Sequence, residues 1–115
     1  MAIQRFEVGA RMSQIVIHGG IVYLSGQVAD DDRAPIDEQT RQVLAKIDPH
    51  LATAGTDKSQ LLTTNIWLKK ISDFAAMNEV WNAWVAPGQP PARATVEATL
   101  ARPSLPVEIM VTAAI

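Results

Sequence analysis

The chain has 115 residues, a formal net charge of −2 and no cysteine. This length suits one domain with a buried core, so we expect a single domain over residues 1–115. The composition excludes disulfides, thiolate metal sites and a cysteine nucleophile, and it lacks the basic balance typical of nucleic-acid binding. Neither a membrane span of about 20 apolar residues nor the apolar core of a signal peptide is present, so we expect a cytoplasmic protein without membrane partners.

The N-terminal part predicts three strands. Residues 3–8 alternate weakly, as in an edge strand, and the β-branched runs 14–18 and 21–28 flank Gly19-Gly20, a typical hairpin turn. Ser25-Gly26 interrupts the third run. A glycine inside a strand often marks a bulge or a close approach of another segment, so we expect one of these there.

Apolar residues at helical spacing predict a first helix over residues 37–54, with Gly55 as its C-terminal stop. Pro49 lies inside this segment, where it removes a backbone donor and clashes with the preceding turn. Either the helix kinks, or Asp48 caps a second short helix that begins at Pro49. We favour the kink.

Residues 61–69 alternate as a strand, and a second helix follows it. We expect Ser72 to cap this helix and Pro87-Gly88 to end it. Its apolar stripe consists of Phe74, Met77, Val80, Trp81, Trp84 and Val85. We interpret the stripe as core rather than as a surface that stacks on a cofactor.

The last two segments, 92–100 and 107–115, also alternate as strands. The predicted order is therefore β-β-β-α-β-α-β-β. Strands and two helices in one small chain favour a single sheet with both helices on one face. The other sheet face then needs cover, and self-association is a simple source of it.

Alternation in the strand at 92–100 places Arg93 on the same face as Thr95 and Glu97. The alternate set is apolar, which suits the helix side, so we expect Arg93 on the side away from the helices, where Glu108 of the last strand joins it. Arg93 then either pairs with Glu97 or Glu108 in a structural ion pair or presents its donors to a carboxylate ligand. The pattern alone leaves both open.

Other candidates for chemistry are weaker. His18 and His50 are isolated and are interpreted as loop or surface residues, and the acidic residues 30–32 favour a solvated loop over a metal site. The chain has neither a nucleophile elbow nor a glycine pattern for phosphate. We therefore expect a site without metal or cofactor.

Four segments closely resemble the RidA (YjgF) family, and their details are nearest to its YoaB-type branch. They are "YLSGQV" (23–28), "DFAAMNEVWNAW" (73–84), "PPARATVEA" (90–98) and "VEI" (107–109). The resemblance covers nearly the whole chain. It implies an α+β, chorismate-mutase-like fold in which three subunits pack their sheets into a central barrel, with clefts between neighbours. It also implies that the strand near residues 62–69 lies between the last two strands.

The resemblance also implies an activity. RidA proteins hydrolyse reactive enamines and imines of amino-acid metabolism, such as 2-aminoacrylate, to 2-keto acids and ammonia without a cofactor. Arg93 matches the arginine that binds the substrate carboxylate, and Glu108 matches the glutamate that orients the attacking water.

Further positions match the cleft of the family. Asn78 matches an asparagine near the cleft, and Ser25-Gly26 match the loop that borders it. Thr95 replaces a cysteine that contributes largely through its backbone. Arg11-Met12 replace an archetypal aromatic region, so Arg11 either binds a second acidic group or pairs with a loop carboxylate.

An alternative is a non-catalytic protein that uses the same cleft to sense a small carboxylate such as a 2-keto acid. A ribonuclease, as some relatives are labelled, fits poorly with an acidic chain. Chorismate mutase shares the architecture, but one obvious cleft arginine is too few for its dianionic substrate.

Overall fold

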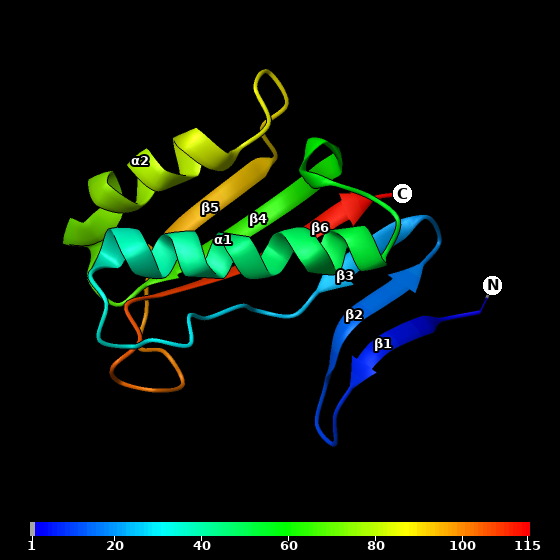
Figure 1. Ribbon diagram of the computed structural model, residues 1–115, viewed down its shortest axis with the longest axis horizontal. Coiled ribbons are helices and arrows are strands. Elements are labelled where there is room, and N and C mark those ends of the chain that lie inside the picture. The colour runs from blue at the N-terminus through cyan, green and yellow to red at the C-terminus, as the bar shows by residue number, and fades with distance from the viewer. Residues whose placement is uncertain (1) are drawn as a thin grey trace.

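The computed structural model describes residues 2–115 and contains one six-stranded mixed sheet with both helices on one face (Figure 1). The strands are β1 (Gln4–Val8), β2 (Ser13–His18), β3 (Ile21–Leu24), β4 (Leu61–Leu68), β5 (Ala92–Glu97) and β6 (Val107–Ala114). The helices are α1 (Ile36–Thr53) and α2 (Phe74–Trp84), with short 3₁₀ turns at Lys58–Gln60 and Ile71–Asp73. The predicted order of elements and the predicted helix layer are confirmed.

The strand order in the sheet is β1-β2-β3-β6-β4-β5. β5 runs parallel to β4, whereas the other neighbouring strands are antiparallel. A parallel pair needs a crossover connection, which α2 supplies between β4 and β5. The prediction that the strand near residues 62–69 lies between the last two strands is confirmed, and β5 is an edge strand.

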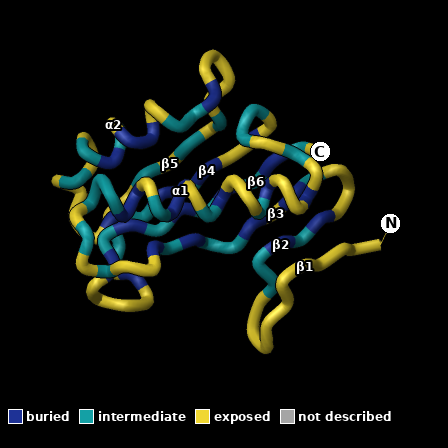
Figure 2. The backbone as a smooth tube through the Cα atoms, in the orientation of Figure 1, coloured by how far each residue is buried: buried dark blue, intermediate teal, exposed yellow. Residues whose placement is uncertain are grey.

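The core lies between the sheet and the two helices (Figure 2). Its largest members include Leu44, Ile47 and Leu51 of α1, Met77 and Trp81 of α2, and Ile66, Leu68, Val107 and Ile109 of the central strands. The helix-free face is only partly covered, and Tyr23 and Val96 there keep 44% and 49% of their surface exposed. None of the helices over residues 2–115 is long and apolar enough to cross a membrane.

The hairpin between β2 and β3 turns at Gly19 and Gly20, whose φ angles are 61° and 77°. Two successive positive φ angles define the turn type whose twist matches paired strands, so the predicted hairpin is confirmed.

Helix α1 runs as one element from Ile36 to Thr53, so the alternative of a second helix beginning at Pro49 is wrong. Gly55 ends it with a φ of 84°. The N–H of Gly55 donates to Ala52 O at 3.0 Å, and that of Thr56 donates to Leu51 O at 3.0 Å. These two bonds satisfy carbonyls of the last turn, which explains the predicted stop.

Three predicted boundaries are wrong. Strand β3 ends at Leu24, before Ser25-Gly26, and does not continue to residue 28. Ser72 lies inside the 3₁₀ turn Ile71–Asp73 and does not cap α2, which begins at Phe74 after Asp73. Strand β5 ends at Glu97, three residues earlier than expected, because the chain turns away after Ala98 donates its N–H to Leu68 O at 2.8 Å.

His50 lies in α1 rather than in a loop. Its Nδ1 lies 3.0 Å from Glu7 Oε2 on edge strand β1. Glu7 has a φ of 51°, an unusual value for a residue with a side chain. The contact therefore joins α1 to a backbone irregularity in β1.

Candidate functional site

The strand register places Arg93 on the helix side of the sheet. In the β4–β5 pair, Arg93 lies beside Thr64 and Thr95 lies beside Ile66. Thr64 and Ile66 are buried under the helices, and paired neighbours in a sheet point to the same face. The prediction that Arg93 faces away from the helices is therefore wrong. Alternation defined two faces, but on this edge strand the polar set, not the apolar set, faces α2.

Aromatic rings surround the guanidinium of Arg93. Its Cζ lies 5.4 Å from the ring centroid of Trp81 and 5.8 Å from that of Phe74, distances typical of cation–π contacts. Among residues 2–115, neither Glu97 nor Glu108 forms an ion pair with it. Glu97 Oε1 instead accepts the N–H of Ile71 at 2.9 Å. The structural ion pair is therefore absent from the described chain.

A cavity of about 340 Å³ opens beside this arginine. It is lined by Asn78, Trp81, Asn82, Pro90, Pro91 and Arg93. Partial burial lowers the pKa of Arg93, but a guanidinium remains protonated in proteins. The cavity therefore contains a fixed positive charge whose N–H donors suit an anion.

Two further predicted site residues present buried polar atoms. Thr95 Oγ1 and Asn78 Oδ1 have no hydrogen-bond partner among the described residues. Thr95 shares the sheet face of Arg93, and Asn78 lines the same cavity as Arg93. Arg93, Asn78 and Thr95 therefore form one polar group on the α2 side of β5.

Glu108 lies on the opposite face of the sheet. It pairs in register with Trp67, whereas its neighbours Val107 and Ile109 are buried on the helix side. Arg93 and Glu108 therefore point to opposite sides of the sheet, with β4 between their strands. The prediction that both lie on one face of a single chain is wrong.

Gly26, in the Ser25-Gly26 turn, lies beside Glu108. A Cβ placed on Gly26 would come within 2.9 Å of Glu108 Cδ, so the carboxyl group occupies the space that glycine leaves open. Backbone bonds in both directions between Gln27 and Ile109, at 2.8 and 3.1 Å, hold the turn on β6. The predicted close approach at Ser25-Gly26 is confirmed.

Arg11 belongs to neither group. It lies exposed in the β1–β2 connection, at the sheet edge opposite β5 (Figure 1). Over residues 2–115 it forms no ion pair, so the predicted pairing with a loop carboxylate is absent from this part of the chain.

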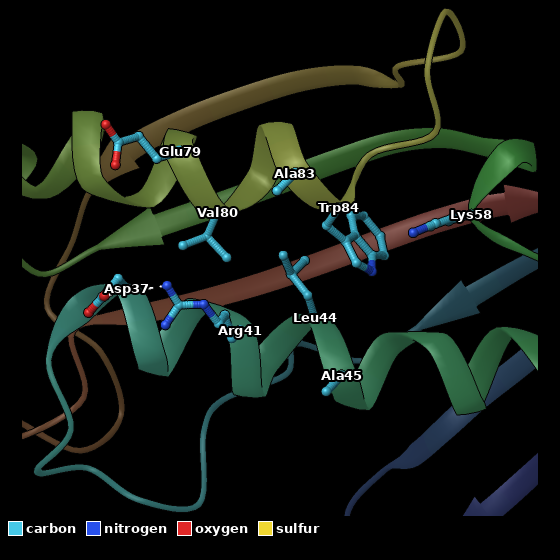
Figure 3. Close-up of a pocket in the computed structure, with 9 residues that line it drawn as sticks. All are labelled: Asp37, Arg41, Leu44, Ala45, Lys58, Glu79, Val80, Ala83 and Trp84. Atoms are coloured by element: carbon cyan, nitrogen blue, oxygen red, sulfur yellow. Dashed lines mark hydrogen bonds and ion pairs between the residues drawn. The ribbon is translucent and has the colours of Figure 1, made fainter.

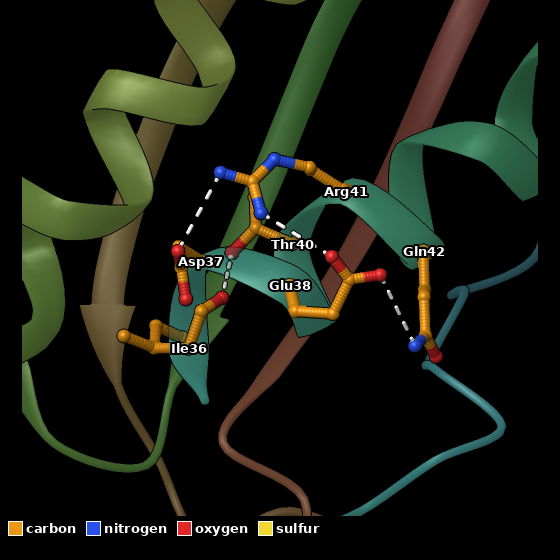
Figure 4. Close-up of polar contacts among 6 residues, drawn as sticks. All are labelled: Ile36, Asp37, Glu38, Thr40, Arg41 and Gln42. Carbon is orange, nitrogen blue, oxygen red and sulfur yellow. Dashed lines mark hydrogen bonds and ion pairs between the residues drawn. The ribbon is translucent and has the colours of Figure 1, made fainter. Parts of the chain in front are cut away.

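A larger cavity, of about 490 Å³, lies between α1 and α2 and contains none of the predicted site residues (Figure 3). Both of its basic side chains, and Asp37, already have partners. Arg41 contacts Asp37 at 3.5 Å and Glu38 at 3.2 Å (Figure 4), and Lys58 lies 5.2 Å from the ring centroid of Trp84. We therefore place the candidate site at the smaller cavity.

Sequence reasoning missed Phe74 and Trp81 as contacts of Arg93, because both were interpreted only as core. A signal was present in their spacing. Phe74, Asn78 and Trp81 are separated by four and three residues, so they share one face of α2.

The sheet order, the helix layer and the two residue groups together define a protein of the RidA (YjgF) class. A solved structure of a YjgF family member from Neisseria meningitidis superposes with a TM-score of 0.96 at 47% sequence identity, covering 99% of this chain and 95% of that one. A sequence profile described as Endoribonuclease L-PSP matches residues 2–115. The chain therefore belongs to the RidA (YjgF) family, the family that its sequence resembles.

Curated relatives agree with this assignment. The RutC family protein YoaB of Escherichia coli is 44% identical over 115 residues, covering 100% of both chains. A RutC family protein of Haemophilus ducreyi is 45% identical over 113 residues, covering 98% of this chain and 97% of that protein. The predicted likeness to the YoaB-type branch is confirmed by the first of these.

Proposed function

We propose that the protein hydrolyses reactive enamines and imines of amino-acid metabolism, of the 2-aminoacrylate type, to 2-keto acids and ammonia. The observation that carries this proposal is Arg93, a partly buried guanidinium beside a cavity and without a carboxylate partner in the described chain. Membership of the RidA (YjgF) family also supports this proposal.

Arg93 binds the substrate carboxylate. A guanidinium has five N–H donors in a planar fork, which matches the two oxygens of a carboxylate. Phe74 and Trp81 orient the fork through their ring faces, and such contacts use none of these donors. An arginine oriented by an ion pair with an Asp or Glu of its own chain would instead have to break that pair before it could bind the substrate.

Glu108 positions water and moves protons. Water adds through its oxygen to the imine carbon while Glu108 takes one of its protons. For an imine protonated on nitrogen, the same carboxyl group then returns this proton to the amino nitrogen of the adduct. The nitrogen leaves as ammonia while the remaining hydroxyl proton passes to Glu108 and the carbon–oxygen double bond forms. Because such imines already hydrolyse quickly in water, a fixed substrate and a placed proton acceptor are sufficient for the acceleration required.

This chemistry requires two subunits, because Arg93 and Glu108 point to opposite sides of the sheet in one chain. We assign the cleft to neighbours in a homotrimer. One subunit provides Arg93, Asn78 and Thr95, and the next provides Glu108 with the Ser25-Gly26 turn. Arg11 is a further candidate for binding substrate. Because it lies exposed in the β1–β2 connection, at the sheet edge opposite β5, it would have to reach the cleft from a neighbouring subunit.

The assay generates 2-aminoacrylate or 2-iminobutyrate with a dehydratase and follows keto-acid release. We expect the purified protein to accelerate this release, and Arg93→Ala to remove most of the acceleration while leaving the oligomer intact. An unchanged rate in Arg93→Ala would contradict the carboxylate clamp. Failure to accelerate the hydrolysis of any of several amino-acid-derived imines would contradict the enzymatic function.

The sensor alternative makes a different prediction in the same experiment. It requires tight, saturable binding of a 2-keto acid by the wild-type protein without any turnover of an imine. The matching profile is described as an endoribonuclease, which is a different activity. A net charge of −2 argues against RNA as a substrate, because proteins that bind RNA neutralise its phosphates with basic side chains.

A further inference from the structure

A buried glutamine lies directly after the Ser25-Gly26 turn. Gln27 is only 6% exposed. Its Nε2 donates to Gln14 Oε1 at 2.9 Å, to Ser25 Oγ at 3.0 Å and to Ser25 O at 3.1 Å. The hydroxyl of Ser25 donates in turn to Gln14 Oε1 at 2.6 Å. The three side chains thus form a closed network in which Gln27 supplies the amide donors and Gln14 supplies the shared acceptor.

The direction of these bonds limits what Ser25 can do. Its hydroxyl proton is committed to Gln14, and one of its lone pairs accepts from Gln27. One lone pair is left, so the hydroxyl can accept a hydrogen bond from a ligand or water but is not prepared as a nucleophile. Its part in the network is therefore to hold the turn.

The network fixes the backbone that contacts Glu108. Ser25 N donates to Gln14 O at 3.0 Å on one side, and Gln27 exchanges two backbone bonds with Ile109 on the other. Gly26 lies between these attachments, against the side chain of Glu108. A shift of this turn therefore opens or closes the space in which the Glu108 carboxyl lies.

We propose that Gln27, acting with Gln14, is a positioning residue that sets the place of the Glu108 carboxyl through the Ser25-Gly26 turn. This inference rests on the proposed function, in which Glu108 orients the attacking water. Gln27 contacts neither substrate nor water in this scheme. Its effect is on the chemical step, because the substrate carboxylate is held separately by Arg93.

The kinetic test uses Gln27→Met, which keeps an unbranched buried side chain and removes the amide donors. We expect kcat to fall by about tenfold to a hundredfold, since small misplacements of a catalytic group have effects of this size. We expect KM to remain within about twofold, because the clamp at Arg93 is intact. A fall in kcat/KM that comes only from KM would overturn the proposal.

The matched control is Gln39→Met. Gln39 is buried like Gln27, and its Nε2 donates to Ala34 O at 3.3 Å near the start of α1. Its substitution introduces the same side chain into the core away from the turn, so we expect kcat close to that of wild type. Equal kcat in Gln27→Met and Gln39→Met would overturn the proposal.

Hydrogen exchange separates this inference from the proposed function. We expect the amides of residues 25–27 to exchange faster in Gln27→Met than in Gln39→Met, and unchanged exchange would overturn the role of Gln27. Wild-type protein without turnover would contradict the proposed function, while the exchange result would still decide whether Gln27 holds the turn. Should Gln27→Met fail to fold, Gln14→Met removes the shared acceptor from a less buried position and must give the same pattern.

Discussion

Two single-residue features matter at the candidate site, namely the charge of Arg93 and the absence of a side chain at Gly26. Arg93 keeps its charge beside aromatic rings, which orient it without neutralising it. Gly26 contributes by having no Cβ, because Glu108 occupies that space. Both features affect the position of a functional group more than the stability of the fold. Substitutions at this scale are therefore expected to affect activity more than stability.

Gly26→Ala tests this at the turn. Gly26 does not have a positive φ, so alanine fits the backbone, and the nearest atoms belong to the mobile end of Glu108. We expect the free energy of unfolding to change by less than about 1 kcal/mol, because the carboxyl can rotate away. We expect kcat for imine hydrolysis to fall by about tenfold or more, because the carboxyl is displaced.

The control for this substitution is Gly9→Ala. A Cβ on Gly9 would lie 3.5 Å from Met12 O, an ordinary contact, and Gly9 has no positive φ. Urea unfolding and the keto-acid assay are to be run on both variants. Equal activity of Gly26→Ala and Gly9→Ala would contradict the placement of Glu108 at the reaction.

At the scale of elements, α1 is held against the sheet by contacts at several points along its length. Lys46 Nζ donates to Val28 O at 2.7 Å and to Asp30 Oδ1 at 2.7 Å, which ties the segment after β3 to the helix. Pro49 interrupts the hydrogen-bond pattern of the same helix near its C-terminal end. The attachment through Lys46 and the local defect at Pro49 can be tested separately.

Pro49→Ala is expected to stabilise the protein. Alanine restores the N–H that can donate to Ala45 O, and Pro49 is exposed, so no packing is lost. Proline inside a helix is about 3 kcal/mol worse than alanine, and we expect a gain of about 1–2 kcal/mol, because the unfolded chain also becomes more flexible. In contrast, Pro35→Ala at the N-cap should lower stability by up to about 1 kcal/mol. A lower melting temperature in Pro49→Ala would contradict this prediction.

The Lys46–Asp30 contact predicts a pH dependence. The hydrogen bond from Lys46 lowers the pKa of Asp30 below its usual value. A group with a lowered folded pKa stabilises the fold above its unfolded pKa of about 4, and this contribution is lost as the pH falls through the folded pKa. Lys46→Met should therefore reduce the free energy of unfolding more at pH 7 than near pH 2.

The remaining effect of this substitution at low pH should come from the bond to Val28 O, which does not titrate. Because Asp30 is fully exposed, the pH-dependent part should be small. Chemical unfolding of wild type and Lys46→Met at both pH values measures it. A difference that is the same at both values would show that the ion pair contributes nothing.

At the scale of the whole molecule, the sheet separates the two halves of the proposed site. One half, with Arg93, lies under α2 at the β5 edge, and the other, with Glu108 and Gly26, lies on the helix-free face. That face also exposes large apolar side chains, including Tyr23 and Val96, which association would bury. A closed assembly of identical subunits would satisfy both the exposed surface and the incomplete site.

Mixing two inactive variants tests the shared site. Arg93→Ala and Glu108→Gln are each expected to lose most activity when assayed alone. If a trimer forms each site from two neighbours, unfolding and refolding the two variants in equal amounts should restore about a quarter of the wild-type activity, since each half-site is intact in half of the subunits. Light scattering of the refolded protein checks that it is trimeric. No recovery in mixed trimers would contradict a site built from two subunits.

Local patterns predicted much of the fold. The Gly19-Gly20 hairpin, the stop at Gly55 and the order of strands and helices follow from turn chemistry and periodicity, which neighbouring residues determine. The cap at Ser72 failed because a 3₁₀ turn precedes α2 and moves the start of the helix to Phe74. Resemblance to the RidA family supplied what periodicity did not, namely the position of β4 between β6 and β5.

The sequence by itself determined which residues are candidates for chemistry, the family to which the chain belongs, and the division of each strand into two faces. Only the tertiary structure decided which face is which. Alternation along β5 is equally compatible with Arg93 on either side, and its pairing beside buried Thr64 places it under α2. Glu108, paired with Trp67, lies on the other side. The face of a residue depends on its neighbours in space, so a single strand does not contain this information.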